Sequence, residues 1–309
     1  MSLRLAWGLG LFAGSLGAGW ALHRLGLLSE RRATRIVRFL VEAPSPLILC
    51  LSFWGMDLRR GEPWVLPLIG MTVAFSTLLP ASWYAHRVRL TRPQTGSFLT
   101  CAFFSNLGYL GAFSAFAVYG EPGYALCMAY LMFFNPCFYL WGFWIAARYG
   151  HSGHLSSGLA RGFSSEMRII PFLGMAAGAW LSIANVPRPL VLEQLNHLLI
   201  PANTALYLIA IGSQLTFESP RPWRGPCLAM SAIKFIYTPL VAWGIVTILH
   251  LHGLTRFVVL LESATPVAVS PLVLPLLFGL DRKLSNALWL FSTLVSIPFL
   301  AIFVYLLAH

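Results

Sequence analysis

Long runs of apolar residues, separated by short polar connections, fill most of the chain. A run of about 20 mostly apolar residues is long enough to cross the hydrocarbon core of a bilayer as a helix. We therefore expect an all-α integral membrane protein with ten transmembrane helices, the first run being a retained span rather than a signal peptide. The expected spans are residues 5–22, 36–54, 64–85, 97–119, 124–147, 168–184, 195–214, 226–249, 256–279 and 286–307.

Charged residues are scarce and lie mostly in the connections. Of 309 residues, 58% are apolar and 10% are charged, whereas a soluble domain has about 25% charged residues. With the N-terminus outside, the inner connections hold 15 Lys and Arg residues and the outer ones five. Since basic connections stay inside, we expect a multi-pass protein of a bacterial inner (plasma) membrane with both termini extracytoplasmic. The net charge of +11 thus reflects topology and the lipid bilayer, and no nucleic acid partner.

The two halves of the chain repeat a pattern of Pro, Trp and Gly residues. The segment Pro63–Pro67 (PWVLP) recurs 159 residues later as Pro222–Pro226 (PWRGP). Further pairs at the same offset are Met71 and Met230, Pro80 and Pro239, and Gly120 and Gly279. Each half holds five expected spans, an odd number, so the second half is inverted relative to the first. Such inverted repeats are common in secondary transporters, although channels and membrane enzymes can also be duplicated.

The fourth and ninth spans contain residues that interrupt a helix. The first interruption is Ser105–Gly111 (SNLGYLG) and the second is Ala264–Pro271 (ATPVAVSP). Gly permits unusual backbone angles and Pro lacks an amide donor. A broken helix at membrane depth is tolerated where it is buried in protein or lines a cavity. We expect half-helix ends to meet near the midplane, where free N–H groups could bind an anion; the alternative is two kinked packing helices.

Three polar residues inside the spans are candidates for function. Glu262 lies four residues before Pro266, and it could carry a proton, coordinate a cation, or be a carboxylate satisfied by a neighbouring helix. Lys234 could pair with Glu262, attract an anionic substrate, or form a structural ion pair. Asn135, directly before a proline, could hydrogen-bond substrate or bridge two helices.

Other residues indicate structural roles or exclude further classes of protein. Asn203 and Gln214 are interpreted as structural polar contacts, and Glu42 as a partner of Arg38. The five cysteines lack metal-ligand spacing, and the histidines fall mostly in connections, so we expect no metal site. Neither a phosphate-binding Gly-rich loop nor a nucleophile with a base is present. We therefore do not expect an enzyme, and we expect no cofactor other than a coupling Na⁺ or H⁺.

Two stretches resemble the auxin efflux carrier family, which includes plant auxin exporters and bacterial carboxylate carriers of the malonate type. The first is Asn106–Gly111, followed by Tyr119–Gly123 and Asn135, and the second is Glu262–Ser270. Ile233–Lys234 is a weaker signal. The pattern of spans covers nearly the whole chain, whereas the specific motifs cover only the two interrupted spans and their flanks.

The resemblance implies a fold similar to that of the bile acid–sodium symporters, in which the broken fourth and ninth helices cross. It implies scaffold helices in residues 1–62 and 168–219, which could form a homodimer, and mobile core helices in 63–148 and 220–309. Residues 149–167 form a cytoplasmic loop, short as in bacterial carriers. The residues expected near substrate are Asn106, Gly108, Gly111, Asn135, Pro266, Ser270 and Lys234, with Glu262 coupling an ion or proton.

The sequence departs from the family at the first interruption. The family has Gly, any residue, then Pro, whereas here Gly111 and Ala112 precede Phe113, which could narrow the pocket. The leading hypothesis is a secondary transporter that carries a small organic anion, a carboxylate, by elevator-like alternating access at the helix crossover. One alternative is a sodium-coupled symporter of an amphipathic anion with Glu262 as cation ligand. Another is a non-transporting membrane sensor with the same fold, for which Phe113 is the support.

Overall fold

The computed structural model describes residues 2–60, 62–150, 170–213 and 221–308. Within these ranges the chain is helical and forms no β-strand. Nearly all of the expected cytoplasmic loop lies outside the described residues, and so does Gln214. The prediction of an all-α protein is therefore confirmed for the part of the chain that the structure describes.

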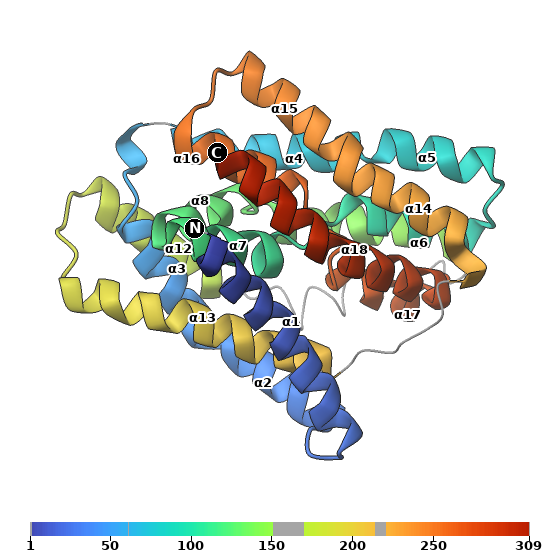
Figure 1. The fold of residues 1–309 in the computed structure, drawn as a ribbon, viewed down its shortest axis with the longest axis horizontal. Helices are drawn as coiled ribbons and strands as arrows, with labels where there is room; N and C mark the ends of the chain where they lie inside the picture. Colours follow the sequence, from blue (N-terminus) through green and yellow to red (C-terminus); the bar gives the residue numbers. More distant parts are fainter. Residues whose placement is uncertain (1, 61, 151–169, 214–220, 309) are drawn as a thin grey trace. The chain divides into compact units, whose positions relative to one another are not determined.

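The helices follow one another along the chain with short connections (Figure 1). The α-helices are α1 (Ser2–Arg24), α2 (Glu30–Glu42), α3 (Pro44–Trp54), α4 (Leu66–Ser76), α5 (Leu78–Arg87), α6 (Arg92–Phe103), α7 (Ala112–Tyr119), α8 (Glu121–Tyr130), α9 (Phe134–Cys137), α10 (Phe143–Tyr149), α12 (Ile170–Ile183), α13 (Leu190–Gly212), α14 (Arg224–Ala232), α15 (Thr238–Ile248), α16 (Gly253–Ser263), α17 (Leu274–Phe278) and α18 (Arg282–Ala308). Three π-helical turns, η3 (Leu107–Gly111), η4 (Phe138–Gly142) and η6 (Ile233–Tyr237), and short 3₁₀ turns complete the described fold.

Several helical stretches have the length and apolarity of membrane spans. Six of them, among the described residues, could cross a bilayer: Glu30–Trp54, Leu66–Arg87, Glu121–Tyr149, Leu190–Gly212, Arg221–Ile248 and Arg282–Leu307. Leu107–Tyr119 and Ile170–Ile183 are apolar but shorter. These helices support a multi-pass membrane protein, while the number of ten spans and their inverted arrangement stay predictions.

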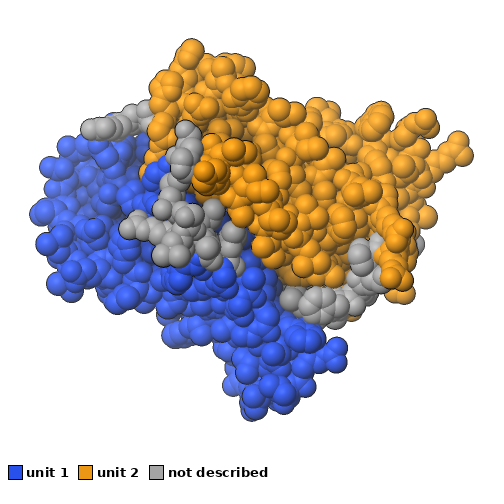
Figure 2. Space-filling view, in the orientation of Figure 1, with its two compact units in different colours: residues 1–65, 108–129, 168–215 blue, residues 66–107, 130–167, 216–309 orange. Residues whose placement is uncertain are grey.

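The chain folds into two compact units, coloured separately in Figure 2. Unit 1 consists of Met1–Val65, Gly108–Ala129 and Arg168–Leu215, and unit 2 of Leu66–Leu107, Tyr130–Met167 and Thr216–His309. Residues 108–129, which the resemblance assigns to the mobile core, thus group with residues 1–65 and 168–215 in unit 1. The division into scaffold and core stays a prediction.

Glycines let two helix pairs of unit 1 approach closely. A Cβ atom at Gly178 of α12 would lie 2.1 Å from the carbonyl oxygen of Cys50 on α3. One at Gly19 of α1 would lie 2.0 Å from the carbonyl oxygen of Ile209 on α13. Small residues permit such backbone contact, which supplies van der Waals packing between helices in a membrane. The sequence GMAAG, with Gly174 one helical turn before Gly178, places both small residues on the face that meets α3.

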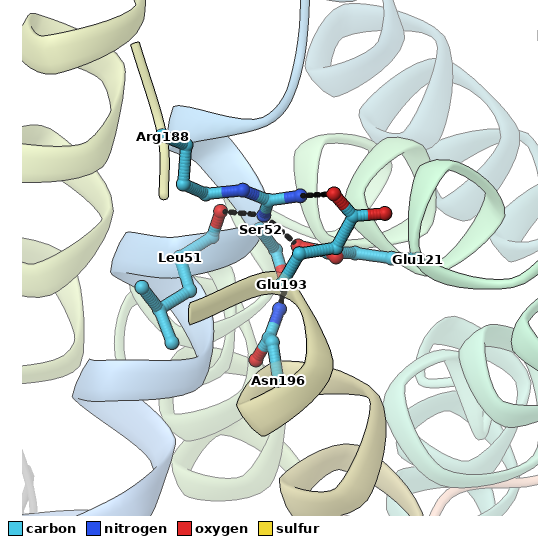
Figure 3. Close-up of polar contacts among 6 residues, drawn as sticks. All are labelled: Leu51, Ser52, Glu121, Arg188, Glu193 and Asn196. Carbon is cyan, nitrogen blue, oxygen red and sulfur yellow. Dashed lines mark hydrogen bonds and ion pairs between the residues drawn. The ribbon is translucent and has the colours of Figure 1, made fainter. Parts of the chain in front are cut away.

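A buried ion pair connects separate helices of unit 1 (Figure 3). Arg188, in the turn between α12 and α13, donates a short hydrogen bond from Nη1 to Oε1 of Glu121, the first residue of α8. The same nitrogen donates to the Leu51 carbonyl at 2.8 Å, and Nη2 lies 3.6 Å from Oε2 of Glu193. Glu121 is only 4% exposed, so its charge is stabilised by Arg188 and by the amino end of α8.

Asn196 completes this cluster from α13. Its Nδ2 donates to Oε1 of Glu121 at 2.7 Å and to Oγ of Ser52 on α3 at 2.9 Å. The Asn196 side chain is fully buried, and a buried amide must find partners or lose free energy. The cluster of Arg188, Glu121, Asn196 and Ser52, here called the arginine cluster, therefore joins α3, α8 and α13.

The core of unit 2 is rich in aromatic side chains. Phe104 packs edge-to-face against Phe134 and Phe138, with ring centroids 5.3 Å and 5.2 Å apart. Phe143 continues this cluster towards Phe278 of α17, at 5.2 Å. These rings come from the end of α6, from α9 and α10, and from α17, so they fix the residues on both sides of the predicted interruptions.

Candidate functional site

Two helices of unit 2 break at the predicted interruptions, although Gly108 and Gly111 lie after the first break, in the π-helical turn η3. Helix α6 ends at Phe103, and Phe104 has an extended backbone with φ −99° and ψ 121°. Helix α16 ends at Ser263, and the chain resumes a helical turn only at Ser270. Within each break the backbone N–H and C=O groups need hydrogen-bond partners outside their own helix.

The two breaks supply those partners to each other. Ser105 and Val267 form an antiparallel β-bridge. The Asn106 amide donates to the Pro266 carbonyl at 2.7 Å, and the Ala268 amide donates to the Phe104 carbonyl at 3.0 Å. Backbone groups exchanged in this way remain satisfied at a depth without water.

A hydroxyl on α18 satisfies the next amide. Pro266 has no N–H to offer, and the Val267 amide donates to Oγ of Ser292 at 3.2 Å. Ser292 is buried, as are Ser285 and Ser296 on the same helix. Ser292 of α18 thus supplies an acceptor to the broken segment of residues 264–269.

Lys234 places a cation at the end of α6. Its side chain is fully buried, and Nζ donates to the Ala102 carbonyl at 2.6 Å and to Oγ of Ser105 at 2.7 Å. In an unbroken helix the Ala102 carbonyl would accept from the amide of Asn106, but that amide is bonded to Pro266. The ammonium therefore occupies the vacated position and complements the negative end of the α6 dipole.

A pocket lies beside the breaks within unit 2. Its empty volume is about 510 Å³, counting the space at its open mouth. The walls are mostly apolar and aromatic, and the polar groups include Ser105, Thr238, Ser263 and the carboxylate residue Glu262. Glu262 is fully buried, and no Lys or Arg is among the residues that line the pocket. The lining residues are Pro67, Gly70, Met71, Val73, Ala74, Thr77, Phe103, Phe104, Ser105, Leu107, Tyr130, Leu131, Phe133, Phe134, Cys137, Thr238, Glu262 and Ser263.

The structure brings some of the predicted site residues together. Asn106 and Pro266 are joined by their backbone hydrogen bond, and Glu262 lines the pocket. Lys234 does not line the pocket and reaches its edge through Ser105. These four residues and their bonds belong to unit 2.

Other predicted residues lie apart from the pocket wall. Asn135 is exposed, although its neighbour Phe134 lines the pocket. Ser270 is half-buried at the start of a 3₁₀ turn, and its hydroxyl has no hydrogen-bond partner among the described residues. Gly108 and Gly111 belong to unit 1.

Sequence reasoning missed several polar residues of the pocket. Ser105 was recognised only as the first residue of the interruption, and Thr77, Tyr130 and Thr238 were not singled out. Ser105 directly precedes Asn106 in an interrupted span, and this position could have identified it as a site residue. Thr77 and Thr238 carry no such signal, because a single hydroxyl within an apolar span is common.

No metal centre is evident in the part of the chain that the structure covers. Within the described ranges, no group of three or more His, Cys, Asp or Glu residues is placed to hold a metal ion. The free cysteines are mostly buried.

Comparison with known proteins assigns the chain to a class. Residues 171–304 match the model of a family described as membrane transport protein. An uncharacterized transporter of Methanothermobacter thermautotrophicus is 25% identical over 281 residues, covering 90% of each chain. An uncharacterized transporter of Methanocaldococcus jannaschii is 23% identical over 299 residues, covering 94% of this chain and 95% of that protein. These similarities confirm the predicted resemblance to a family of membrane transport proteins.

Proposed function

We propose that the chain is a secondary transporter of a small organic anion, a carboxylate, whose binding site is the pocket beside the paired breaks of unit 2. The observation that supports this most directly is the contact of two broken helices next to a pocket that contains a buried carboxylate. Breaks of this kind cost backbone hydrogen bonds and persist in membrane proteins where they line a site.

The chemistry of the pocket suits an anion that enters with a neutralising partner. An anionic substrate beside the Glu262 carboxylate would meet a like charge in a medium of low dielectric constant. A proton on Glu262, or a cation beside it, removes that repulsion. We infer that Glu262 couples entry of the anion to a proton or to Na⁺.

Lys234 has an indirect part in this proposal. Its ammonium is bonded to the Ala102 carbonyl and to Ser105, so it holds the broken end of α6 and orients the Ser105 hydroxyl towards the pocket. The positive charge nearby also favours an anion in the pocket. Asn106, Gly108, Gly111, Pro266 and Ser270 would shape the crossover, and Asn135 would act from its flank.

The wider arrangement follows from the resemblance and the repeat. We propose ten spans in two inverted halves, both termini outside, in an inner membrane, with a homodimer formed through the scaffold helices. Alternating access would come from elevator-like movement of the core helices, as in carriers of the auxin efflux type. The shared spacing of motifs in the two halves supports this arrangement.

Uptake into proteoliposomes tests the proposal. Labelled malonate, malate and indole-3-acetate would be offered while sodium, proton and voltage gradients are varied separately. We expect saturable uptake of at least one of them, driven by a proton or sodium gradient. The variant Glu262→Gln should lose the gradient dependence, whereas Glu193→Gln, which alters an exposed carboxylate of unit 1, should keep it.

The same experiment separates the alternatives. Sodium-dependent uptake of indole-3-acetate that disappears in Glu262→Gln would favour the sodium-coupled symporter of an amphipathic anion. Gradient-dependent uptake that is unchanged in Glu262→Gln would contradict the coupling role. Binding of one of these anions to folded protein without flux would identify a sensor.

A further inference from the structure

Helix α2 carries a row of arginines on one face. Arg31, Arg35 and Arg38 are all exposed. With 3.6 residues per turn they project within about 60° of one another around the helix axis. This face is here called the basic stripe of α2; Glu42 lies at its C-terminal end.

The opposite face of α2 is anchored in unit 1. Ala33 and Leu40 are buried, and Ala33 packs with Leu28 and Ala210 in one apolar cluster. Arg32 donates from Nη1 to the Leu27 carbonyl at 3.0 Å, which fixes the turn from α1 into α2. The rotation of α2 is therefore set, and the basic stripe lies on the face opposite the buried Ala33 and Leu40.

Exposed apolar side chains lie beside these arginines. Leu25 and Leu27 in the turn before α2 are 71% and 59% exposed, and Phe39 is 62% exposed. Large apolar groups mixed with arginines on one surface suit the boundary between headgroups and acyl chains, where both find a favourable environment. Water alone would satisfy only the arginines.

The length of the helical stretch places this surface at the headgroups. Glu30–Trp54 contains 25 residues and is one of the candidate spans. At 1.5 Å per residue it is about 37 Å long, whereas the hydrocarbon core is about 30 Å thick. Its apolar half is α3, so the surplus of about 7 Å, a little over one turn, falls at the arginine-rich end.

We propose that the basic stripe of α2 binds the headgroups of anionic phospholipids. Between residues 24 and 42 the chain has five arginines and two glutamates, an excess of positive charge next to an apolar surface. Guanidinium groups bind phosphate in a bidentate manner. Each arginine at an anionic membrane surface strengthens binding by about fivefold.

Native mass spectrometry of the full chain in detergent tests this, with phosphatidylglycerol and phosphatidylcholine as the titrated lipids. We expect tighter binding of phosphatidylglycerol. In Arg31→Gln/Arg35→Gln its Kd should rise at least tenfold, with no change for phosphatidylcholine. Arg31→Lys/Arg35→Lys should keep most of the preference. The matched control Arg87→Gln/Arg89→Gln, which removes two exposed arginines of unit 2, should behave as the unaltered chain.

Three results would overturn the proposal. One is an unchanged lipid preference in Arg31→Gln/Arg35→Gln, and another is an equal loss in the control pair. The third is displacement of phosphatidylglycerol by millimolar inorganic phosphate, which would identify a site for free phosphate. Should the double variant not fold, photo-crosslinking of the unaltered chain with a photoactivatable phosphatidylglycerol decides: crosslinks within residues 24–42 support the proposal, and their absence there contradicts it.

Discussion

The two units of this chain bury polar groups in different ways. In unit 1 the backbones of α3 and α12 approach closely at Gly178, and Arg188 and Asn196 of the arginine cluster both donate to the Glu121 carboxylate. In unit 2 two helices break, their backbones pair, and a pocket remains beside Glu262. Unit 1 thus contains close helix packing and a bonded charge cluster, whereas unit 2 contains interrupted helices beside a pocket.

The contrast indicates different roles for the buried charged residues of the two units. Buried charges in unit 1 are bonded to one another, which fixes the position of helices. The charge of Lys234 in unit 2 is bonded to a serine hydroxyl and to a backbone carbonyl that a helix break left without its usual donor. Strained or broken backbone that is held in place by such contacts is typical of functional sites. We therefore expect substitutions in unit 1 to change stability and those in unit 2 to change uptake as well.

The largest expected effect comes from Arg188→Met in unit 1. Without its guanidinium, the buried Glu121 carboxylate keeps the Asn196 amide and the amino end of α8 but loses its ion-pair partner, and breaking a buried ion pair in this way costs about 3–5 kcal/mol. Thermal unfolding in detergent should show a large decrease in Tm, with KM for uptake by the remaining folded protein unchanged. Arg59→Met is the control, because Arg59 is exposed and its guanidinium donates to the Ile183 carbonyl rather than to a buried carboxylate. An equal decrease in Tm for both variants would contradict the role of the arginine cluster.

A smaller loss of stability is expected for Gly178→Ala. The added methyl group would lie 2.1 Å from a backbone oxygen of α3, so the helices must separate, at about 3 kcal/mol. Gly17→Ala on α1 is the matched control, because nothing lies within 4 Å of the corresponding position. The free energy of unfolding of Gly17→Ala should not fall, since Ala favours helix over Gly. Similar unfolding curves for the two variants would show that the close approach of α3 and α12 adds nothing to stability.

Ser105→Ala in unit 2 should lower stability by about 2 kcal/mol and also impair uptake. The substitution removes one of the two oxygens that the buried Lys234 ammonium contacts, and hydrogen bonds to charged groups contribute about 1.5–3 kcal/mol. Because Ser105 also lines the pocket, KM should rise. A lower Tm with an unchanged KM would place Ser105 outside the substrate site.

The smallest effect is expected for Ser292→Ala on α18. It removes the acceptor of the Val267 amide, and one unsatisfied buried amide costs about 1 kcal/mol. The paired breaks would keep their other hydrogen bonds, so uptake should fall only slightly. Ser296→Ala serves as control, because its hydroxyl bonds within its own helix, to the Thr293 carbonyl. A larger uptake defect in Ser296→Ala would contradict the assigned role of Ser292.

The sequence predicted local features better than contacts between distant residues. The interruption at residues 264–271 contains two prolines, whose effect acts on their own backbone. The first break covers residues 104–106 and lies just before Gly108 and Gly111, which form part of a π-helical turn. The pairing of Ser105 with Val267 depends on the tertiary fold, and no pattern in either segment specifies that register. The same holds for Glu121 and Arg188, which are 67 residues apart in the sequence.

Side-chain direction limited the prediction of the site. Asn135 was expected near substrate because an amide beside a proline at membrane depth is unusual, yet it is exposed. Asn135 lies in the short helix α9, and a π-helical turn begins three residues later, at Phe138; such a turn changes which residues share a face. For Lys234 the sequence left three possible partners open: an anionic substrate, Glu262, or another residue in a structural ion pair. The observed bonds to Ala102 and Ser105 could be predicted only with knowledge of the break in α6.

The central claim, that substrate passes through the pocket of unit 2, is tested most directly by filling it. Ala74 of α4 lines the pocket, and Ala74→Trp would occupy space that an anion needs. Leu68→Trp is the matched variant on the same helix, at a position that is 59% exposed. Uptake into proteoliposomes should be lost in Ala74→Trp and retained in Leu68→Trp, with both proteins folded. Uptake by folded Ala74→Trp at the rate of the unaltered chain would contradict the account.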